Sequence, residues 1–312
     1  MNYSEDYISN FGKKTGFINS NIEKVMRLLD VLKFIDEEFN KTFHLLVLKG
    51  GTAINLMYTN LARLSVDIDL DYIGSLEKDK ALQDRERILN SLDNYMLKEG
   101  YSVSSKSRGS VILTSRTYSY TNAYGNRDNI KLEINFIDRI HILPTTYAKI
   151  NYFDKEVMVQ TPLEEELFAM KICALIDRSK PRDLYDVFKL KKNMLNLSKD
   201  NLRKLTVFYL SLDGIFELSE KSFDKIKAIT QDSIKKELLP VLNKNERFAL
   251  EDTKEDVIGF LKELLVLSDD EKKYLEEFVE GTFDPSLLFD AHSAEKAAKH
   301  PMAKWRVTNI KR

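Results

Sequence analysis

Two short segments of this 312-residue chain carry the residues best suited to chemistry, a glycine turn and a row of aspartates. The turn, Gly50-Gly51-Thr52, follows an apolar run at Leu45–Leu48. The aspartates, Asp67, Asp69 and Asp71, begin fifteen residues after the threonine of the turn. Because side chains alternate across a strand, the three carboxylates are predicted to share one face. Such aligned charges are stable when they are solvated or when a cation lies between them.

The glycine turn is a candidate phosphate site. Glycine lets backbone N–H groups approach an anion closely, and the Thr52 hydroxyl adds a further donor. A phosphate cradle beside carboxylates that hold a divalent metal is the minimum equipment for phosphoryl or nucleotidyl transfer. A solvated strand face with three acids is the other interpretation, although aspartate is disfavoured in strands.

The order of these motifs resembles that of the AbiEii/MenT-type nucleotidyltransferases, the toxins of bacterial abortive-infection and toxin–antitoxin pairs within the DNA polymerase β-like superfamily. The resemblance rests on Lys49–Tyr58 and Arg63–Asp69, where two glycines, a short helix and Asp-x-Asp follow one another. It implies that Asp67 and Asp69 bind the catalytic Mg²⁺ or Mn²⁺, and that Gly50, Gly51 and Thr52 hold the phosphates of an NTP. Asp71, one step further along the same face, is expected at the rim of the site.

A second motif, Lys131-Leu132-Glu133-Ile134-Asn135, alternates polar and apolar residues. Half-buried edge strands show the same alternation, so the pattern alone does not specify a function. In the superfamily that the chain resembles, a strand beside the Asp-x-Asp strand supplies a third carboxylate. The resemblance therefore implies Glu133 as a metal ligand or as the general base for the attacking hydroxyl. Lys131 is an alternative phosphate contact.

A third motif joins Lys171 to Arg182-Asp183-Leu184-Tyr185-Asp186. Lys171 borders the apolar stripe of a predicted helix, where a lysine commonly extends its ammonium group to solvent. The resemblance implies instead that Lys171 contacts the triphosphate and that at least one of Asp183 and Asp186 is essential. Arg182 in this motif, and Arg63 and Ser65 beside the aspartates, complete the expected nucleotide-binding set. Arg63 is equally well read as an ordinary arginine at the start of a strand.

Composition limits the partners and the compartment. With 48 basic and 49 acidic residues the net charge is −1, so RNA contacts must use local patches. Two basic segments are candidates, Arg178–Arg182 and the tail Lys296–Arg312. The tail is read either as a solvated final helix whose Trp305 anchors it to the core, or as an arm that contacts phosphates. One cysteine, Cys173, and no visible signal sequence or membrane-length apolar run favour a cytoplasmic protein.

Periodicity predicts an α+β fold in two domains. Residues 1–160 are expected to form a mixed sheet with helices, and residues 161–312 a helical domain. The resemblance implies that the first is of the nucleotidyltransferase type and that the second closes the active-site cleft. Thr161 and Pro162 are expected to cap and begin the first helix of the second domain. The predicted elements of the first domain are helices at residues 18–39, 53–61 and 79–99, and strands at residues 45–48, 65–73, 101–103, 110–118, 129–137 and 156–160.

These expectations combine into one function. A hydroxyl group would attack the α-phosphorus of an NTP and expel pyrophosphate, with the resemblance implying a tRNA 3′ end as acceptor and a cognate antitoxin as protein partner. Transfer to a protein or a small molecule remains an alternative, as does a nucleotide-binding regulatory protein without turnover.

Overall fold

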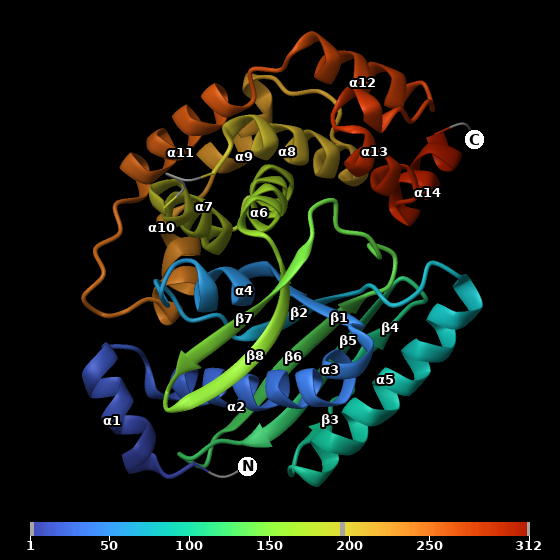
Figure 1. Ribbon diagram of the computed structural model, residues 1–312. Coiled ribbons are helices and arrows are strands. Elements are labelled where there is room, and N and C mark those ends of the chain that lie inside the picture. The colour runs from blue at the N-terminus through green and yellow to red at the C-terminus, as the bar shows by residue number, and fades with distance from the viewer. Residues whose placement is uncertain (1–2, 194–196, 311–312) are drawn as a thin grey trace. The chain divides into compact units, whose positions relative to one another are not determined.

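The computed structural model describes residues 3–193 and 197–310 (Figure 1). The described chain divides into two compact units. The first contains the residues up to Arg139, Thr145–Thr161 and Pro240–Glu246, and the second contains Ile140–Pro144, Pro162–Leu239 and the residues from Arg247 onward. This division differs from the predicted one by two short segments, at residues 140–144 and 240–246, each of which belongs to the other unit.

A mixed sheet forms the centre of the first unit. Its strand order is β1-β2-β6-β5-β3, and β4 pairs with β5. β2 and β6 are parallel, and the other pairs are antiparallel. The predicted α+β class is therefore confirmed. The strands are β1 (Leu46–Lys49), β2 (Asp67–Tyr72), β3 (Ser102–Val103), β4 (Arg108–Gly109), β5 (Leu113–Thr121) and β6 (Arg127–Asn135).

Two long helices, α2 (Asn19–Ile35) and α5 (Lys78–Lys98), pack on one face of this sheet. Tyr118 of β5 donates to Asp93 of α5 at 2.7 Å, and Arg27 of α2 lies over the Tyr120 ring at 4.2 Å. Even-numbered side chains of β2, β5 and β6 therefore face the helices, and odd-numbered ones lie on the opposite face. We call that opposite face the polar face, because its residues in β2 and β6 are Asp67, Asp69, Asp71, Arg127, Asn129, Lys131, Glu133 and Asn135.

The predicted helices of the first unit all exist, with shifted ends. α2 runs into a π-helical turn at Asp36–Asn40 and a short α3 (Lys41–Phe43). α4 (Gly50–Met57) starts at the glycines themselves, three residues before its predicted start, because Gly50 adopts the positive φ of 69° that the turn requires. A further helix, α1 (Glu5–Thr15), is capped by Ser4, whose hydroxyl accepts from the Tyr7 N–H.

A separate two-stranded sheet joins β7 (Thr145–Tyr152) to β8 (Lys155–Pro162). Periodicity predicts β8 but not β7, in which Ile150 alone is buried, so the hydrophobic signal of that strand is weak. Because β8 continues to Pro162, the predicted cap at Thr161 is wrong. The following helix starts at Glu164 without a side-chain cap, and the three glutamates of its first turn interact favourably with the helix dipole instead.

Helices make up the second unit, as predicted. Its long helices bury a cluster of aromatic rings that includes Phe208, Tyr274 and Phe278. No helix within residues 3–193 and 197–310 is long and apolar enough to cross a membrane. The helices are α6 (Glu164–Arg178), α7 (Pro181–Asn193), α8 (Lys199–Asp213), α9 (Asp224–Lys227), α10 (Gln231–Ser233), α11 (Leu250–Leu264), α12 (Asp269–Val279), α13 (Ala291–Ala298) and α14 (Pro301–Ile310), with short 3₁₀ or π turns at Glu220–Phe223, Ile234–Leu238, Leu239–Val241 and Pro285–Leu287.

The basic tail is attached through its cations. The Arg306 guanidinium donates twice to the Leu212 carbonyl, at 2.6 and 3.0 Å, and Lys296 donates to the Ile142 carbonyl at 2.9 Å. Trp305 is 45% exposed, so its predicted role as the core anchor is wrong. Lys311 and Arg312, which also belong to the predicted arm, lie outside the described residues.

Candidate active site

The two strands that carry the predicted carboxylates are neighbours in register. Asp67 of β2 lies opposite Lys131 of β6, and Asp69 lies opposite Glu133. Paired strands run about 4.8 Å apart, and residues opposite each other in a parallel pair point to the same face. The structure therefore brings Asp67, Asp69 and Glu133 together on the polar face. Sequence periodicity predicts the face of each strand but not this pairing, which joins segments more than sixty residues apart.

The glycine turn lies on the other side of β2. β1 pairs with β2, so that Lys49 is opposite Asp69, and Gly50 follows directly. A Cβ atom at Gly50 would lie 2.5 Å from Asp69 Oδ2. The backbone at the start of α4 thus touches the Asp69 carboxylate, and a side chain at this position would displace it.

Gly51 is a second glycine that neighbouring side chains approach closely. A Cβ atom there would lie 2.5 Å from Arg63 Nη2 and 3.2 Å from Ser65 Oγ. Arg63 is 2% exposed, and its Nη1 donates to the Leu64 carbonyl at 3.0 Å. Two of the predicted nucleotide-binding side chains therefore lie against the glycine turn.

Thr52 is buried in the turn, with 1% of its surface exposed. Its hydroxyl donates to the Asp67 carbonyl, and its oxygen lies 2.9 Å from Ser65 Oγ. This contact joins the start of α4 to the start of β2. Because the hydroxyl has a single proton and donates it to Asp67, a phosphate contact at Thr52 would use its backbone N–H.

Asp71 lies in the interior, and its predicted place at the rim is wrong. Its side chain is fully buried, with Lys49 Nζ 2.5 Å from Oδ1. Burial by itself lowers the pKa of Lys49, but the charges of Asp71 and Asp138 outweigh it and raise that pKa above its usual range. The buried aspartate is thus compensated by a lysine from the neighbouring strand, a pairing that local sequence does not indicate.

Glu133 also has a basic partner. Lys131 Nζ lies 2.7 Å from Glu133 Oε2. Burial lowers the pKa of Lys131, but the hydrogen bond and charge of Glu133, with smaller contributions from Asp67 and Asp69, raise it overall. The lysine therefore remains charged beside the acidic row.

The oxygen donors on the polar face suit a hard divalent cation such as Mg²⁺ or Mn²⁺. Asp67 and Asp69 are partly exposed and lie one above the other on the same strand face. Across the residues that the structure describes, no group of three His, Cys, Asp or Glu side chains is placed to hold a metal. Asp67 and Asp69 are accordingly the pair that fits a cation, while the Glu133 carboxylate is bonded to Lys131.

The third predicted motif forms a buried cluster in the second unit. Lys171 of α6 is 5% exposed, and its Nζ lies 2.9 Å from Asp183 Oδ1 and 3.2 Å from Asp186 Oδ2. Arg178 Nε donates to Asp183 Oδ2 at 2.8 Å. Burial raises the pKa of the Asp183 carboxyl, but Lys171 and Arg178 outweigh it and hold that pKa well below its usual range. Lys171 does not extend to solvent; it ties α6 to α7. Arg182 is half-buried on α7.

Sequence reasoning missed a further buried carboxylate in this unit. Glu166 of α6 is fully buried and accepts from the backbone N–H groups of Ile142 and Leu143 at 2.7 and 2.9 Å. The Tyr209 hydroxyl also donates to it. These bonds hold the segment 140–144 in the second unit. No local sequence signal marks Glu166, because its partners come from distant segments.

A mixed sheet with an Asp-x-Asp strand behind a glycine turn defines the nucleotidyltransferase class. Residues 34–290 match the family described as nucleotidyl transferase AbiEii toxin, type IV toxin–antitoxin system, and the chain belongs to this family. It is a toxin nucleotidyltransferase, as the motifs predicted. The fold is similar to that of MenT4, a nucleotidyltransferase toxin from Mycobacterium tuberculosis H37Rv, with a TM-score of 0.66, 14% identity and 99% of each chain covered. No curated protein sequence matches the chain significantly.

Proposed function

We propose that the chain uses Mg²⁺ or Mn²⁺ to transfer NMP from an NTP to the 3′-terminal hydroxyl of an RNA, specifically a tRNA, with release of pyrophosphate. The observation that carries the proposal is the position of Asp69, whose carboxylate touches Gly50 on one side and lies in register with Glu133 on the other. The glycine turn that would hold the phosphates, the aspartates that would bind the cation and the candidate base therefore lie on adjacent elements. These elements are the turn before α4, β2 and β6.

The glycine turn binds the triphosphate in this proposal. The first N–H groups of α4 have no partner within the helix and carry the positive end of its dipole, which favours an anion. Arg63, packed against Gly51, adds a charge that suits phosphate oxygens. A divalent cation bound by Asp67 and Asp69 would neutralise phosphate charge and polarise the α-phosphate.

Glu133 is the general base. Lys131 donates to one of its oxygens at 2.7 Å, and in this proposal the carboxylate accepts the proton of the attacking hydroxyl. The acceptor oxygen forms a bond to the α-phosphorus as the bond to the bridging oxygen of pyrophosphate breaks. Holding these groups in place supplies most of the rate acceleration.

The buried cluster of α6 and α7 positions Lys171. A lysine fixed by Asp183 and Asp186 keeps its charge and loses little further freedom when a phosphate binds. We assign Lys171 and Arg182 to the triphosphate, and Asp183 and Asp186 to holding Lys171 in place. The family implies a cognate antitoxin as the protein partner.

A labelling experiment tests the proposal. The protein is incubated with each α-³²P-labelled NTP and total bacterial RNA, and the RNA is then separated and mapped. We expect label on tRNA 3′ ends, with Asp69→Asn at least about 10⁴-fold slower because it removes an anionic metal ligand. Asp79→Asn, an exposed acid on α5, is the matched control and should keep wild-type activity.

Other outcomes contradict parts of the proposal. Label on protein alone would make the acceptor assignment wrong, and tight NTP binding without pyrophosphate release would indicate a regulatory protein. In bacteria, the chain expressed without antitoxin should arrest growth, and Asp69→Asn should not. Equal arrest by the variant would show that toxicity does not depend on transfer.

A further inference from the structure

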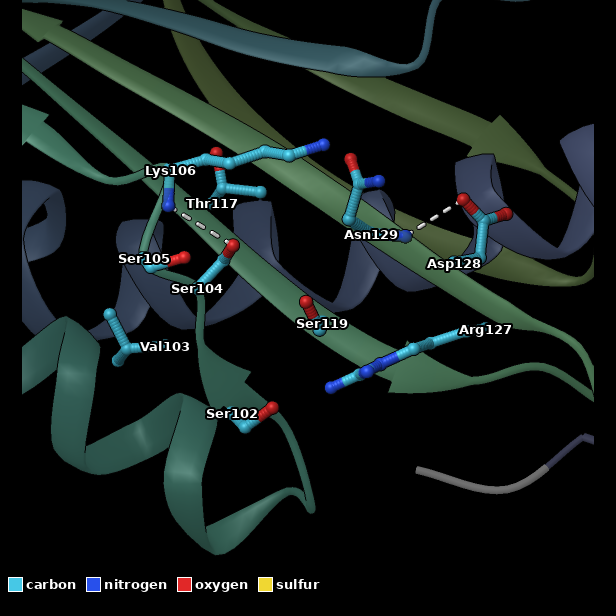
Figure 2. A pocket seen from close by; sticks show the side chains of 10 residues that line it. All are labelled: Ser102, Val103, Ser104, Ser105, Lys106, Thr117, Ser119, Arg127, Asp128 and Asn129. Atoms are coloured by element: carbon cyan, nitrogen blue, oxygen red, sulfur yellow. Dashed lines mark hydrogen bonds between the residues drawn. The ribbon is translucent and has the colours of Figure 1, made fainter.

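A polar groove of about 400 Å³ lies on the first unit, where the edge of the sheet meets the loop after β3 (Figure 2). Its lining includes five hydroxyl side chains, Ser102, Ser104, Ser105, Thr117 and Ser119, and two cations, Lys106 and Arg127. Figure 2 shows these side chains on β3, β5, β6 and the loop that follows β3. The groove has no role in the site described above.

The groove continues the row of catalytic residues across the sheet. Asp67 lies opposite Lys131, and Lys131 lies opposite Thr117, which lines the groove. The next pair along the same strands, Asn129 opposite Ser119, lies in the groove as well. Because neighbouring strands lie about 4.8 Å apart, Thr117 lies about 10 Å across the sheet from Asp67, with Lys131 between them.

The direction of the reaction assigns this side of the sheet to the acceptor. In phosphoryl transfer the attacking and leaving oxygens lie roughly in line on opposite sides of the phosphorus. The glycine turn, which holds the leaving pyrophosphate in the proposed function, adjoins β2 from the β1 side. The attacking hydroxyl must therefore arrive from the β6–β5 side, where Glu133 and the groove lie.

The chemistry of the lining suits a sugar–phosphate backbone. Within the described part of the chain, neither Arg127 nor Lys106 forms a side-chain ion pair or hydrogen bond. The acid in the lining, Asp128, is already bound to Lys24, with Nζ 2.6 Å from Oδ1. Hydroxyl and amide side chains and cations are the usual contacts of nucleic-acid phosphates and sugars. Among the residues that the structure describes, no aromatic side chain lines the groove, so these residues offer no platform on which bases could stack.

We propose that this groove binds the backbone of the single-stranded 3′ segment of the acceptor RNA and directs its terminal hydroxyl to Glu133. The proposal rests on the proposed function for the identity of the acceptor. It assigns Arg127 and Lys106 to phosphates and the hydroxyl side chains to phosphate or ribose oxygens. Because the contacts are to the backbone, binding in the groove depends on salt and little on sequence.

Binding without chemistry tests the groove directly. The full chain is titrated into a short single-stranded RNA, labelled at its 5′ end, over a range of salt concentrations and without NTP. Arg127→Ala and Lys106→Ala should each weaken binding about fivefold and lower the slope of log K against log[salt] by about 0.7. Lys98→Ala, an exposed lysine of α5 on the helix-covered side, is the matched control and should change neither quantity.

Blocking the groove tests its role in the reaction. Ser119→Trp should raise the KM for RNA at least about tenfold and leave the KM for NTP unchanged, while Ser119→Ala should have little effect. Thermal unfolding shows whether each variant is folded. If Ser119→Trp does not fold, the Arg127→Ala and Lys106→Ala variants still test the groove. Arg127→Lys should restore most of the salt dependence lost in Arg127→Ala.

The failures of the two proposals are distinguishable. If wild-type protein labels RNA but Arg127→Ala and Lys106→Ala retain its RNA affinity and salt slope, the groove assignment is wrong and the proposed function stands. If wild-type protein releases pyrophosphate while labelling protein and binding no RNA, both the acceptor and the groove assignment are wrong, and the nucleotidyltransferase site remains.

Discussion

Two clusters of charged residues differ in how their charges are compensated. In the second unit, the buried Lys171 and the exposed Arg178 balance the buried Asp183 and Asp186. In the first unit, the polar-face positions of β1, β2 and β6 hold four carboxylates, Asp67, Asp69, Asp71 and Glu133, against two lysines, Lys49 and Lys131. The acids of the second-unit cluster are paired with its own bases, whereas Asp67 and Asp69 of the first unit are partly exposed oxygen donors that a cation can bind.

Because of this difference, we expect substitutions in one cluster to lower stability and substitutions in the other to lower activity. Removing one member of a balanced buried cluster leaves an uncompensated charge in the interior, which is costly. Asp67 and Asp69 are partly exposed, so removing either should cost less stability, but it removes a candidate metal ligand. Substitutions in the two clusters should therefore affect different measurements.

The largest stability effect is expected at Lys171. Lys171→Ala should lower the free energy of unfolding by about 3–5 kcal/mol, because it leaves Asp183 and Asp186 buried without their shared ammonium group. Chemical denaturation measures this loss. The triple variant with Asp183→Asn and Asp186→Asn should recover part of it, since no carboxylate is then left uncompensated. A folded, fully stable Lys171→Ala would show that the cluster is not structural.

A smaller effect is expected at Gly50. Gly50→Ala should cost about 1–2 kcal/mol in stability from its positive φ, and about 10²-fold in activity because the new Cβ displaces the Asp69 carboxylate. Gly100→Ala is the matched control, since Gly100 also has a positive φ but nothing within 4 Å of a built Cβ. It should lose similar stability and no activity. Equal activity in the two variants would contradict the contact with Asp69.

The smallest effect is expected in the pH dependence of stability. The pKa of Asp183 is lowered in the folded state, whereas an unfolded aspartate titrates near 3.9. Its stabilising contribution is therefore fully present above about pH 5 and is lost as the pH falls below 4 toward the folded pKa. The difference in unfolding free energy between wild type and Asp183→Asn should shrink by about 1 kcal/mol from pH 4 to pH 3. A constant difference over this range would contradict the ion pairs.

Local sequence patterns predicted most of the helices and strands of the first unit. Alternation in Asp67–Asp71 and Lys131–Asn135 predicted which side chains share a face, and the register of β2 with β6 agrees with both. The same patterns missed β7. Ile150 is its one buried residue, so the strand carries little hydrophobic signal. They also misplaced the start of α6, because Thr161 and Pro162 suit both a helix start and the end of a strand.

Contacts between distant segments account for the remaining differences. The ion pair of Asp71 with Lys49, the inward hydroxyl of Thr52 and the buried bonds of Glu166 each depend on neighbours that only the fold supplies. The groove escaped sequence reasoning for the same reason, since Ser102, Ser119 and Arg127 come from three separate strands. Hydroxyl side chains and isolated cations carry no distinctive pattern on their own.

The central claim is that Asp67 and Asp69 of the first unit bind a cation, while the balanced cluster of the second unit does not. Mn²⁺ binding to the nucleotide-free protein, measured by electron paramagnetic resonance, tests it most directly. We expect Asp69→Asn to weaken Mn²⁺ binding more than about 100-fold and Asp183→Asn to leave it near wild type, with both variants shown to be folded. Wild-type Mn²⁺ affinity in Asp69→Asn, or an equal loss in both variants, would contradict the account.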